Sequence, residues 1–323
     1  MRAVLVVPAL LTLGATLAES PALGRLAALA GAPVATRDGL APALASATGL
    51  PAGTPPAPLA ARGAGWPRAT GDVQYADPIT LVAGRDDVLF AGRADDLTHD
   101  ESAALIAHLD AHFAVDGLEF AAPRPDAWFV ASQDVPLAET TALPALEGAL
   151  ASALPRGPEA KRWRRWLSEA QMLLHEHPVN AAREAAGRAP VTGVWLWGGG
   201  AASSPSPVID SAVYATDERD GDVARGLAAG ALPPPAKFSA LDRGRDALVV
   251  LPRIATADAL PALDRDWLAP LAAAVHDGTV HEAVLVADDG RVAYTWHARR
   301  PSGWQRLRAR FASPRFTLPE NAS

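Results

Sequence analysis

The stretch HPVNAAREAAGRAPVTGVWLWGGG, residues 177–200, decides the fold because it places a helix end, a strand and a glycine run in a fixed order. His177 precedes Pro178, and a residue before proline avoids the α-helical region, so a helix ends here. Residues 194–197 form a short apolar run, which is typical of a buried strand. The run Gly198-Gly199-Gly200 follows and predicts a turn that closes this strand.

Upstream of this stretch, residues 159–176 carry the clearest helical pattern in the chain. Apolar side chains recur at helical spacing and predict one buried face. They are Trp163, Trp166, Leu167, Ala170, Leu173 and Leu174. Arg162, Arg164 and Arg165 lie mostly off this stripe. Arginines can grip phosphate, but a solvated helix face is the interpretation we favour for these three.

Shorter elements are predicted further upstream. Thr98 and Glu101 have the spacing of a capping box, which starts a helix that runs to about Phe113. Other helices are expected at residues 21–30 and 41–48, and strands at 80–82, 88–90, 118–120 and 128–131. Residues 51–67 are rich in Pro, Gly and Ala and read as a linker or long loop, and Ser203–Pro207 reads as a second linker.

The amino-terminal apolar run has two interpretations. Residues 3–7 resemble a buried parallel strand stopped by Pro8, which is the interpretation we favour. The same run, with Ala15-Thr16-Leu17-Ala18 after it, also imitates a weak signal peptide and its cleavage site. In the second case the protein would be secreted after removal of a leader.

The carboxyl-terminal part predicts a parallel sheet. Residues 247–251 and 283–287 are buried-strand candidates, and the helical stretch 266–275 lies between them, as in a parallel crossover. Asp288-Asp289-Gly290 predicts a hairpin turn that leads to a strand at 292–295. Asp288 could alternatively act as a metal ligand.

Composition excludes several classes of function. The chain has 323 residues, of which 49% are hydrophobic, a formal net charge of -7 and no cysteine. Disulfides, thiolate catalysis and cysteine-ligated metal sites are therefore excluded. A negative net charge gives the protein no general electrostatic attraction to nucleic acid. No segment reaches the ~20 apolar residues that span a bilayer. We expect neither nucleic acid nor a membrane as a partner.

Two pairs of histidines are candidate ligands. His108 and His112 are four residues apart on a predicted helix and share a face, but the metalloprotease motif also needs Glu beside the first histidine, and here the neighbour is Leu109. His175 and His177 bracket a helix end, where the helix dipole favours a cation. Helix termination explains much of the second pair without any ligand.

Residues 174–200 resemble a segment of the archaeal-type cofactor-independent phosphoglycerate mutases, which belong to the alkaline-phosphatase superfamily. The matching pattern is HPVN, then Arg183, Gly187, Pro190 and the apolar strand with its glycines, and Gly193 stands where that pattern has a second Asn. Other stretches look closer to a bacterial offshoot, the phosphoglycerate-mutase-like regulatory proteins of the RpfE type. They are Tyr75-Ala76-Asp77-Pro78, Arg85-Asp86, residues 166–175 and residues 194–200.

The resemblance implies an α/β fold, a degenerate alkaline-phosphatase-like core interrupted by an inserted α+β domain. Residues 1–70 and 240–323 would form the core, and residues 71–239 the insert that carries the motif.

The family's metal site is degraded in this sequence. An active member would hold two divalent metals with Asp and His at strand ends, and would use a Ser or Thr nucleophile. The first Asp is replaced by Pro8-Ala9. The counterpart of a histidine-rich segment, residues 252–261, keeps only Thr256 and Asp258. The final Asp-His pair would fall at Asp288-Asp289-Gly290, which has no histidine.

We therefore expect a non-catalytic, phosphoglycerate-mutase-like regulatory or binding protein in the cytoplasm, with no metal cofactor. Its partner would be an unknown small anionic ligand or a protein. The alternative is a metal-dependent cofactor-independent phosphoglycerate mutase or phosphatase with a rearranged site that uses Mn or Mg.

The candidate ligand site consists of the best-preserved motif residues: His177, Asn180, Arg183, Gly198, Gly199 and Gly200. The planar donors of Arg183 suit phosphate or carboxylate, and the glycine run could present backbone N–H groups to an anion. A second interpretation needs no ligand, since Asn180 and Arg183 could tie the helix end to the following strand.

Overall fold

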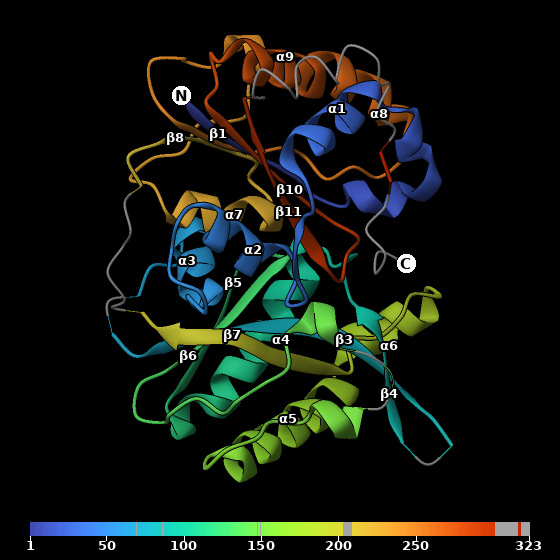
Figure 1. Cartoon of the computed structure of the whole chain (residues 1–323). Coiled ribbons are helices and arrows are strands. Elements are labelled where there is room, and N and C mark those ends of the chain that lie inside the picture. The colour runs from blue at the N-terminus through green and yellow to red at the C-terminus, as the bar shows by residue number, and fades with distance from the viewer. Residues whose placement is uncertain are drawn as a thin grey trace. The chain divides into compact units, whose positions relative to one another are not determined.

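A computed structural model describes residues 1–68, 70–85, 87–146, 148, 150–202, 209–300 and 316–317. The linker expected at 203–207 and the motif residue Asp86 lie outside these described residues. The chain forms two compact units, Met1–Thr54 with Pro207–Ser323 and Pro55–Ser206 (Figure 1). The expectation of an α/β core that carries an inserted α+β domain is confirmed.

The first unit is built on a mostly parallel sheet of strand order β2-β11-β10-β1-β9-β8. Strand β1 pairs in parallel with β10 on one side and β9 on the other, and β9 pairs in parallel with β8. Strands β11 and β2 add antiparallel pairs at one edge. The strands are β1 (Arg2–Val7), β2 (Val34–Thr36), β8 (Ala212–Ala215), β9 (Ala247–Val250), β10 (Glu282–Asp288) and β11 (Ala293–Arg299). The strands predicted at 3–7, 247–251 and 283–287 and the hairpin after Asp288 are confirmed.

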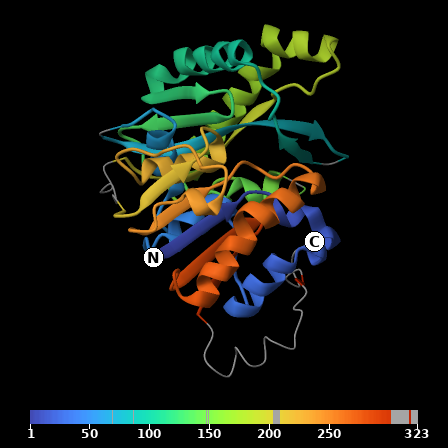
Figure 2. The ribbon, with the colours of Figure 1, turned by 90° about the horizontal axis from the view of Figure 1, so that it is seen from above.

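Helices cover both faces of this sheet, because strands buried on both sides alternate apolar side chains toward each face. Alternate residues such as Leu5, Val249 and Leu285 share one core with side chains of α1, α8 and α9. The ribbon shows the orange helix α9 lying along the strands of this sheet (Figure 2). Helices α2 and α7 contact each other and the strands β10 and β8. The helices are α1 (Pro21–Ala30), α2 (Leu40–Ala47), α7 (Arg219–Gly226), α8 (Leu260–Leu263) and α9 (Ala269–Asp277), with 3-10 turns at Leu10–Glu19 and a π-helical turn at Asp264–Leu268 between α8 and α9.

The second unit is built on an antiparallel sheet in which β3 is the central strand. Strand β3 pairs with β7 on one side, and with β6 and then β4 on the other, while β5 pairs with β6. The strands are β3 (Asp72–Ala83), β4 (Val88–Arg93), β5 (Leu118–Arg124), β6 (Ala127–Ser132) and β7 (Gly193–Ala201). They extend the four short strands and the apolar run that the sequence predicts.

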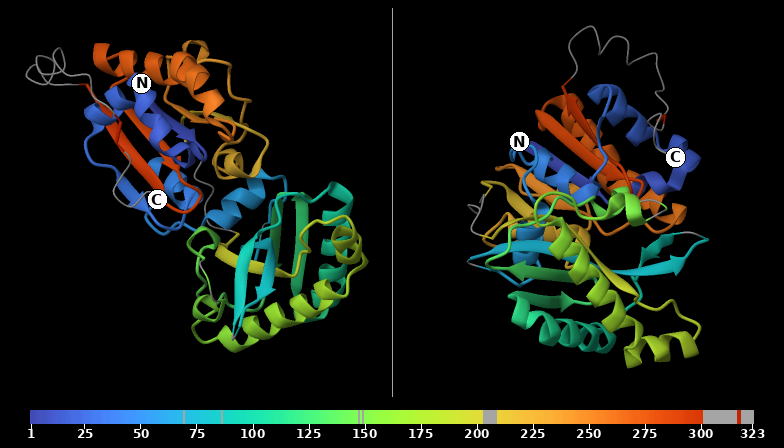
Figure 3. Two further views of the ribbon diagram at one scale, coloured as in Figure 1. Left: turned by 90° about the vertical axis from the view of Figure 1, so that its right-hand side faces the viewer. Right: turned by 90° about the horizontal axis from the view of Figure 1, so that it is seen from below.

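Two helices cover one face of this second sheet (Figure 3). Helix α4 (His99–Phe113) begins at the predicted capping box, and α5 (Ala160–His175) buries Trp163, Trp166, Ala170 and Leu174 as its stripe predicts. These side chains form one core with inward residues of β5, β6 and β7. Helix α6 (Pro178–Ala185) follows α5 after a sharp corner.

On the opposite face of the second sheet lies a helix, where the sequence predicted a linker or long loop at 51–67. Residues Pro56–Gly63 form helix α3, which packs on β3, β6 and β7. Proline is tolerated in a first helical turn, and the small side chains of this segment are buried. The unit boundaries also differ from the expected 70/71 and 239/240: α3 belongs to the second unit, whereas β8 and α7 belong to the first unit.

Candidate functional site

The preserved motif forms the corner between α5 and β7. His177 is the N-cap of α6, and its Nδ1 accepts the N–H of Val179 at 3.2 Å. The His177 ring is buried and lies 5.2 Å, between centroids, from the ring of His108 on α4. Burial lowers the pKa of His177, and the charge of a protonated His108 lowers it further. A neutral imidazole is what the cap requires, because Nδ1 must accept a hydrogen bond.

Asn180 closes the loop between α6 and β7. Its Nδ2 donates to the backbone oxygens of Leu174 and Val191, each at 2.7 Å, and its Oδ1 accepts the N–H of Val191 at 2.8 Å. The residue is 3% exposed. Its amide therefore satisfies backbone groups at the end of α5 and in the loop just before β7, as the second sequence interpretation proposed.

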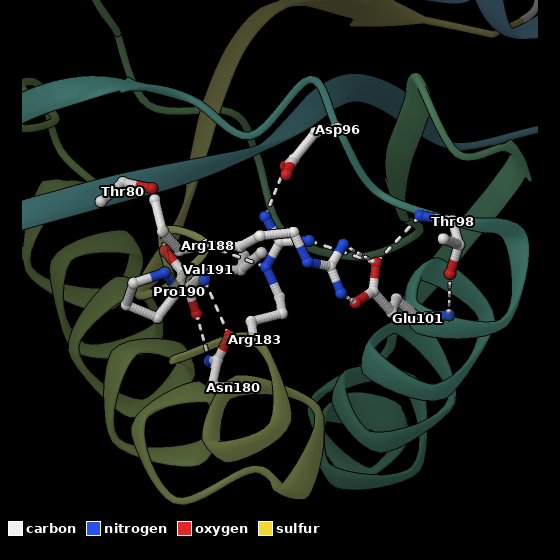
Figure 4. A network of polar contacts seen from close by, with 10 residues as sticks. Thr80, Asp96, Thr98, Glu101, Asn180, Arg183, Arg188, Pro190 and Val191 are labelled. Carbon is white, nitrogen blue, oxygen red and sulfur yellow. Dashed lines mark hydrogen bonds and ion pairs between the residues drawn. The ribbon is translucent and has the colours of Figure 1, made fainter. Parts of the chain in front are cut away.

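Arg183 is the buried centre of a charged network, shown in Figure 4. Its side chain is 0% exposed. Nε donates to the backbone oxygen of Ala189 at 2.8 Å, NH1 donates to Glu101 at 3.1 Å, and NH2 pairs with Asp96. The expectation that Arg183 offers its planar donors to a ligand is contradicted, since carboxylates of its own chain already occupy them.

Glu101 joins the capping box of α4 to this network. Its carboxylate accepts the backbone N–H of Thr98 at 3.0 Å and pairs with both Arg183 and Arg188. Burial raises the pKa of Glu101, but the Arg188 and Thr98 hydrogen bonds and the charges of Arg183 and Arg188 outweigh it and lower the pKa to about 2. One carboxylate thus fastens the start of α4 to the loop after α6.

The run Gly198-Gly199-Gly200 was expected to form a turn after the strand, and this expectation is wrong, because the run lies inside β7. Val73 pairs with Gly200 and Tyr75 with Trp197, so Gly198 and Gly199 together oppose Gln74 in a β-bulge. Gly198 has a φ of 65°, which favours glycine. A Cβ on Gly199 would lie 2.5 Å from Gln74 Cγ, and one on Gly200 would lie 2.3 Å from Pro55 Cγ. Close packing therefore explains the glycines without an anion.

The Tyr75–Pro78 stretch also has a structural explanation. The ring of Tyr75 stacks on Trp197 at 4.6 Å between centroids and on Phe129 at 5.4 Å. Asp77 is fully buried and accepts the indole N–H of Trp197 at 2.6 Å. The motif thus holds β3 against β7 and β6.

The remaining candidate residues are dispersed over the second unit. His112 lies 3.6 Å from Glu169, and His175 is exposed at the end of α5. Arg165 pairs with Asp116 and Glu169, and Arg162 with Glu159, on an exposed helix face. In the described part of the chain, no three His, Asp or Glu side chains are grouped so that they could hold a metal ion.

The expected counterparts of the metal ligands lie in the first unit. Ala9, at a φ of 59°, follows β1, and its N–H donates to Asp288 Oδ1 at 2.7 Å. Asp288 is 3% exposed, and Oδ2 accepts the N–H of Gly290 at 2.9 Å. Burial raises its pKa. Thr256 and Asp258 are exposed on the segment after β9. These residues do not fit a dinuclear metal site, because Ala9 has no ligand atom in its side chain and both Asp288 oxygens accept backbone N–H groups, one from Ala9 and one from Gly290 of the hairpin turn.

Sequence reasoning missed four charged residues that the structure places in ion pairs: Asp96, Arg188, and Arg253 with Asp220 at 3.0 Å. Arg188 lies within the motif itself, and Asp96 lies two residues before the cap Thr98. The pairing of these two regions could not be predicted, because 82 residues separate Glu101 from Arg183.

None of the helices in the described part of the chain is both long enough and apolar enough to cross a bilayer.

No protein-family model matches the chain. The 2,3-bisphosphoglycerate-independent phosphoglycerate mutase of Methanosarcina barkeri is 28% identical over 155 residues, which cover 47% of this chain. The match spans only 38% of that curated relative's length.

Two solved structures align over 92% of the chain. They are a cofactor-independent phosphoglycerate mutase from Thermoplasma acidophilum (TM-score 0.42, 19% identity, 89% of that chain) and a protein of Pyrococcus horikoshii (TM-score 0.47, 13% identity, 87% of that chain). The chain is thus distantly similar in sequence to the cofactor-independent phosphoglycerate mutases.

Proposed function

We propose that this chain is a phosphoglycerate-mutase-like protein without mutase activity, which acts by binding a partner. The finer assignment, a regulatory protein of the RpfE type, belongs to the same proposal and is motivated by the sequence stretches quoted above. The observation that carries the proposal is the donor set at the strand ends of the first unit. Pro8-Ala9 stands at the first ligand position, and Asp288 accepts backbone N–H groups with both oxygens.

The reaction of an active mutase explains why this observation matters. Two divalent metals would stabilise the negative phosphoryl oxygens and lower the pKa of the nucleophile. Loss of one ligand is severe for such a site, because coordination number and geometry decide metal affinity. Here the first Asp and the histidines are absent together.

The test is conversion of 3-phosphoglycerate to 2-phosphoglycerate by purified protein with Mn²⁺ or Mg²⁺. We expect a rate equal to that of buffer. A metal-dependent rate that is lost on chelation would reject the proposal and favour the second candidate, a metal-dependent mutase or phosphatase with a rearranged site. The buried carboxylate of Asp288 at a strand end favours this second candidate.

The partner in this proposal is a small anionic ligand or a protein, and the motif corner is no longer its binding site. A thermal-shift screen with sugar phosphates and nucleotides would find such a ligand, because a molecule that binds only the folded state raises its stability. A screen in which no compound raises the melting temperature would favour a protein partner.

We also propose that the protein acts in the cytoplasm with its amino terminus retained. Strand β1 lies between β9 and β10 in the sheet of the first unit. Cleavage near Glu19 would remove this central strand, together with the Ala9 N–H that Asp288 accepts.

A further inference from the structure

Four parallel strands of the first unit end side by side, and each end adds a group to one charged cluster. Asp288 is the last residue of β10, and Ala9 follows β1. Arg253 follows β9, and Asp220 lies in the first turn of α7, after β8. Backbone hydrogen bonds from Leu251 to Val6 and from Ile254 to Pro8, each 3.0 Å, hold the ends of β9 and β1 together. Open α/β sheets bind ligands beyond such carboxyl ends, so charge here has consequences.

Each carboxylate oxygen of this cluster has a partner within the unit. Arg253 binds Asp220 with two donors, Nε to Oδ2 at 3.0 Å and NH2 to Oδ1 at 3.2 Å. Asp288 accepts the N–H groups of Ala9 and Gly290. The charges of Asp220 and Arg253 both act on Asp288, the first against its ionised form and the second in favour of it. The side chain of Asp220 is 14% exposed and that of Arg253 is 51% exposed.

We propose that the guanidinium of Arg253 takes the place of a metal ion at these strand ends. It is the fixed cation that balances Asp220 and Asp288, so the first unit folds and stays folded without a divalent cation. A planar guanidinium suits this role because it is always charged and binds a carboxylate with two parallel hydrogen bonds. The inference rests on the proposed loss of the metal site and adds the residue that replaces its charge.

Removal of Arg253 has a specific consequence in this arrangement. Asp220 would lose both of its donors while remaining mostly buried, and its negative charge acts against the ionised form of the buried Asp288. The freed carboxylate of Asp220, with the negative charge of Asp288 acting on it, forms a weak oxygen site that Mn²⁺ or Mg²⁺ can bind. The variant should therefore become sensitive to divalent cations, whereas the wild-type protein should not be.

The experiment is thermal unfolding of the full chain in EDTA and in millimolar Mn²⁺. We expect the wild-type melting temperature to be the same in both. Arg253→Ala should melt a few degrees lower in EDTA and recover part of the loss in Mn²⁺, because an ion bound only by the folded state stabilises it. Asp220→Asn in the Arg253→Ala background should restore part of the loss and abolish the Mn²⁺ response. The matched control is Arg25→Ala, an exposed arginine on α1, which should change neither quantity.

Two results would overturn the inference. The first is a wild-type protein that Mn²⁺ stabilises and EDTA destabilises. The second is an Arg253→Ala variant that melts like the wild type and does not respond to Mn²⁺. The second result leaves the proposed function intact if the mutase assay is negative, whereas mutase activity of the wild type removes the proposed function itself.

Discussion

The substitution Arg183→Ala tests the reinterpretation of the motif corner most sharply. Three interactions disappear: the bond to the Ala189 backbone oxygen and the pairs with Glu101 and Asp96. Breaking a buried ion pair by removing one partner typically costs about 3–5 kcal/mol. The loss of unfolding free energy is smaller for Arg183→Ala, because Glu101 keeps its ion pair with Arg188 and the side chain of Asp96 is half exposed.

We therefore expect the free energy of unfolding to fall by about 2–4 kcal/mol. For a unit of this size each kcal/mol lowers the melting temperature by roughly 2–4 °C, so the expected fall is roughly 4–16 °C. Arg183→Lys keeps the charge but loses the planar fork, so it should lie between Arg183→Ala and the wild type.

The assay is thermal and urea unfolding of Arg183→Ala beside a control, Arg162→Ala. Arg162 is exposed on α5 and makes an ion pair with Glu159 at 3.6 Å, so its removal should change stability by less than about 0.5 kcal/mol. Equal melting temperatures for the two variants would refute the structural role of Arg183. So would an Arg183→Ala protein of unchanged stability that has lost affinity for an anionic ligand.

Three further predictions follow from the described contacts. Glu101 and Glu282 have pKa values lowered to about 2, so the stability they contribute is complete above the unfolded pKa of about 4.5 and is lost as pH falls toward 2. Glu101→Gln should therefore flatten this part of a plot of unfolding free energy against pH. An unchanged plot would contradict the lowered pKa of Glu101. Gly199→Ala should lower the melting temperature because its Cβ meets Gln74, whereas Gly230→Ala, with open space around it, should not; equal melting temperatures would reject the packing explanation. Intact mass of protein from its native host should show a chain that retains residues 1–19, and a species that starts near Glu19 would contradict the role of β1.

Local patterns in the sequence predicted much of the fold. The capping box at Thr98 and Glu101, the tryptophan stripe of α5 and the hairpin at Asp289-Gly290 each depend on residues close in the chain, and all three are present. Helix α3 was missed because its prolines and small residues look like a linker, and only burial against the second sheet makes it helical.

The candidate site was harder to predict because its meaning depends on contacts between distant residues. The motif singled out Arg183 and Asn180, but Glu101 and Asp96, which occupy the donors of Arg183, lie on another helix and loop. The glycine run was misread for the same reason, since Gln74 and Pro55 are its neighbours only after the sheet and α3 have formed.

Direct measurement of Mn²⁺ binding by electron paramagnetic resonance tests the central claim, the absence of a functional metal site. Aqueous Mn²⁺ gives a six-line signal that is lost when the ion binds a protein. We expect stoichiometric addition of the chain to leave this signal undiminished, because Arg253 and backbone N–H groups occupy Asp220 and Asp288. Loss of the signal in proportion to added protein, and its return on addition of EDTA, would contradict the account.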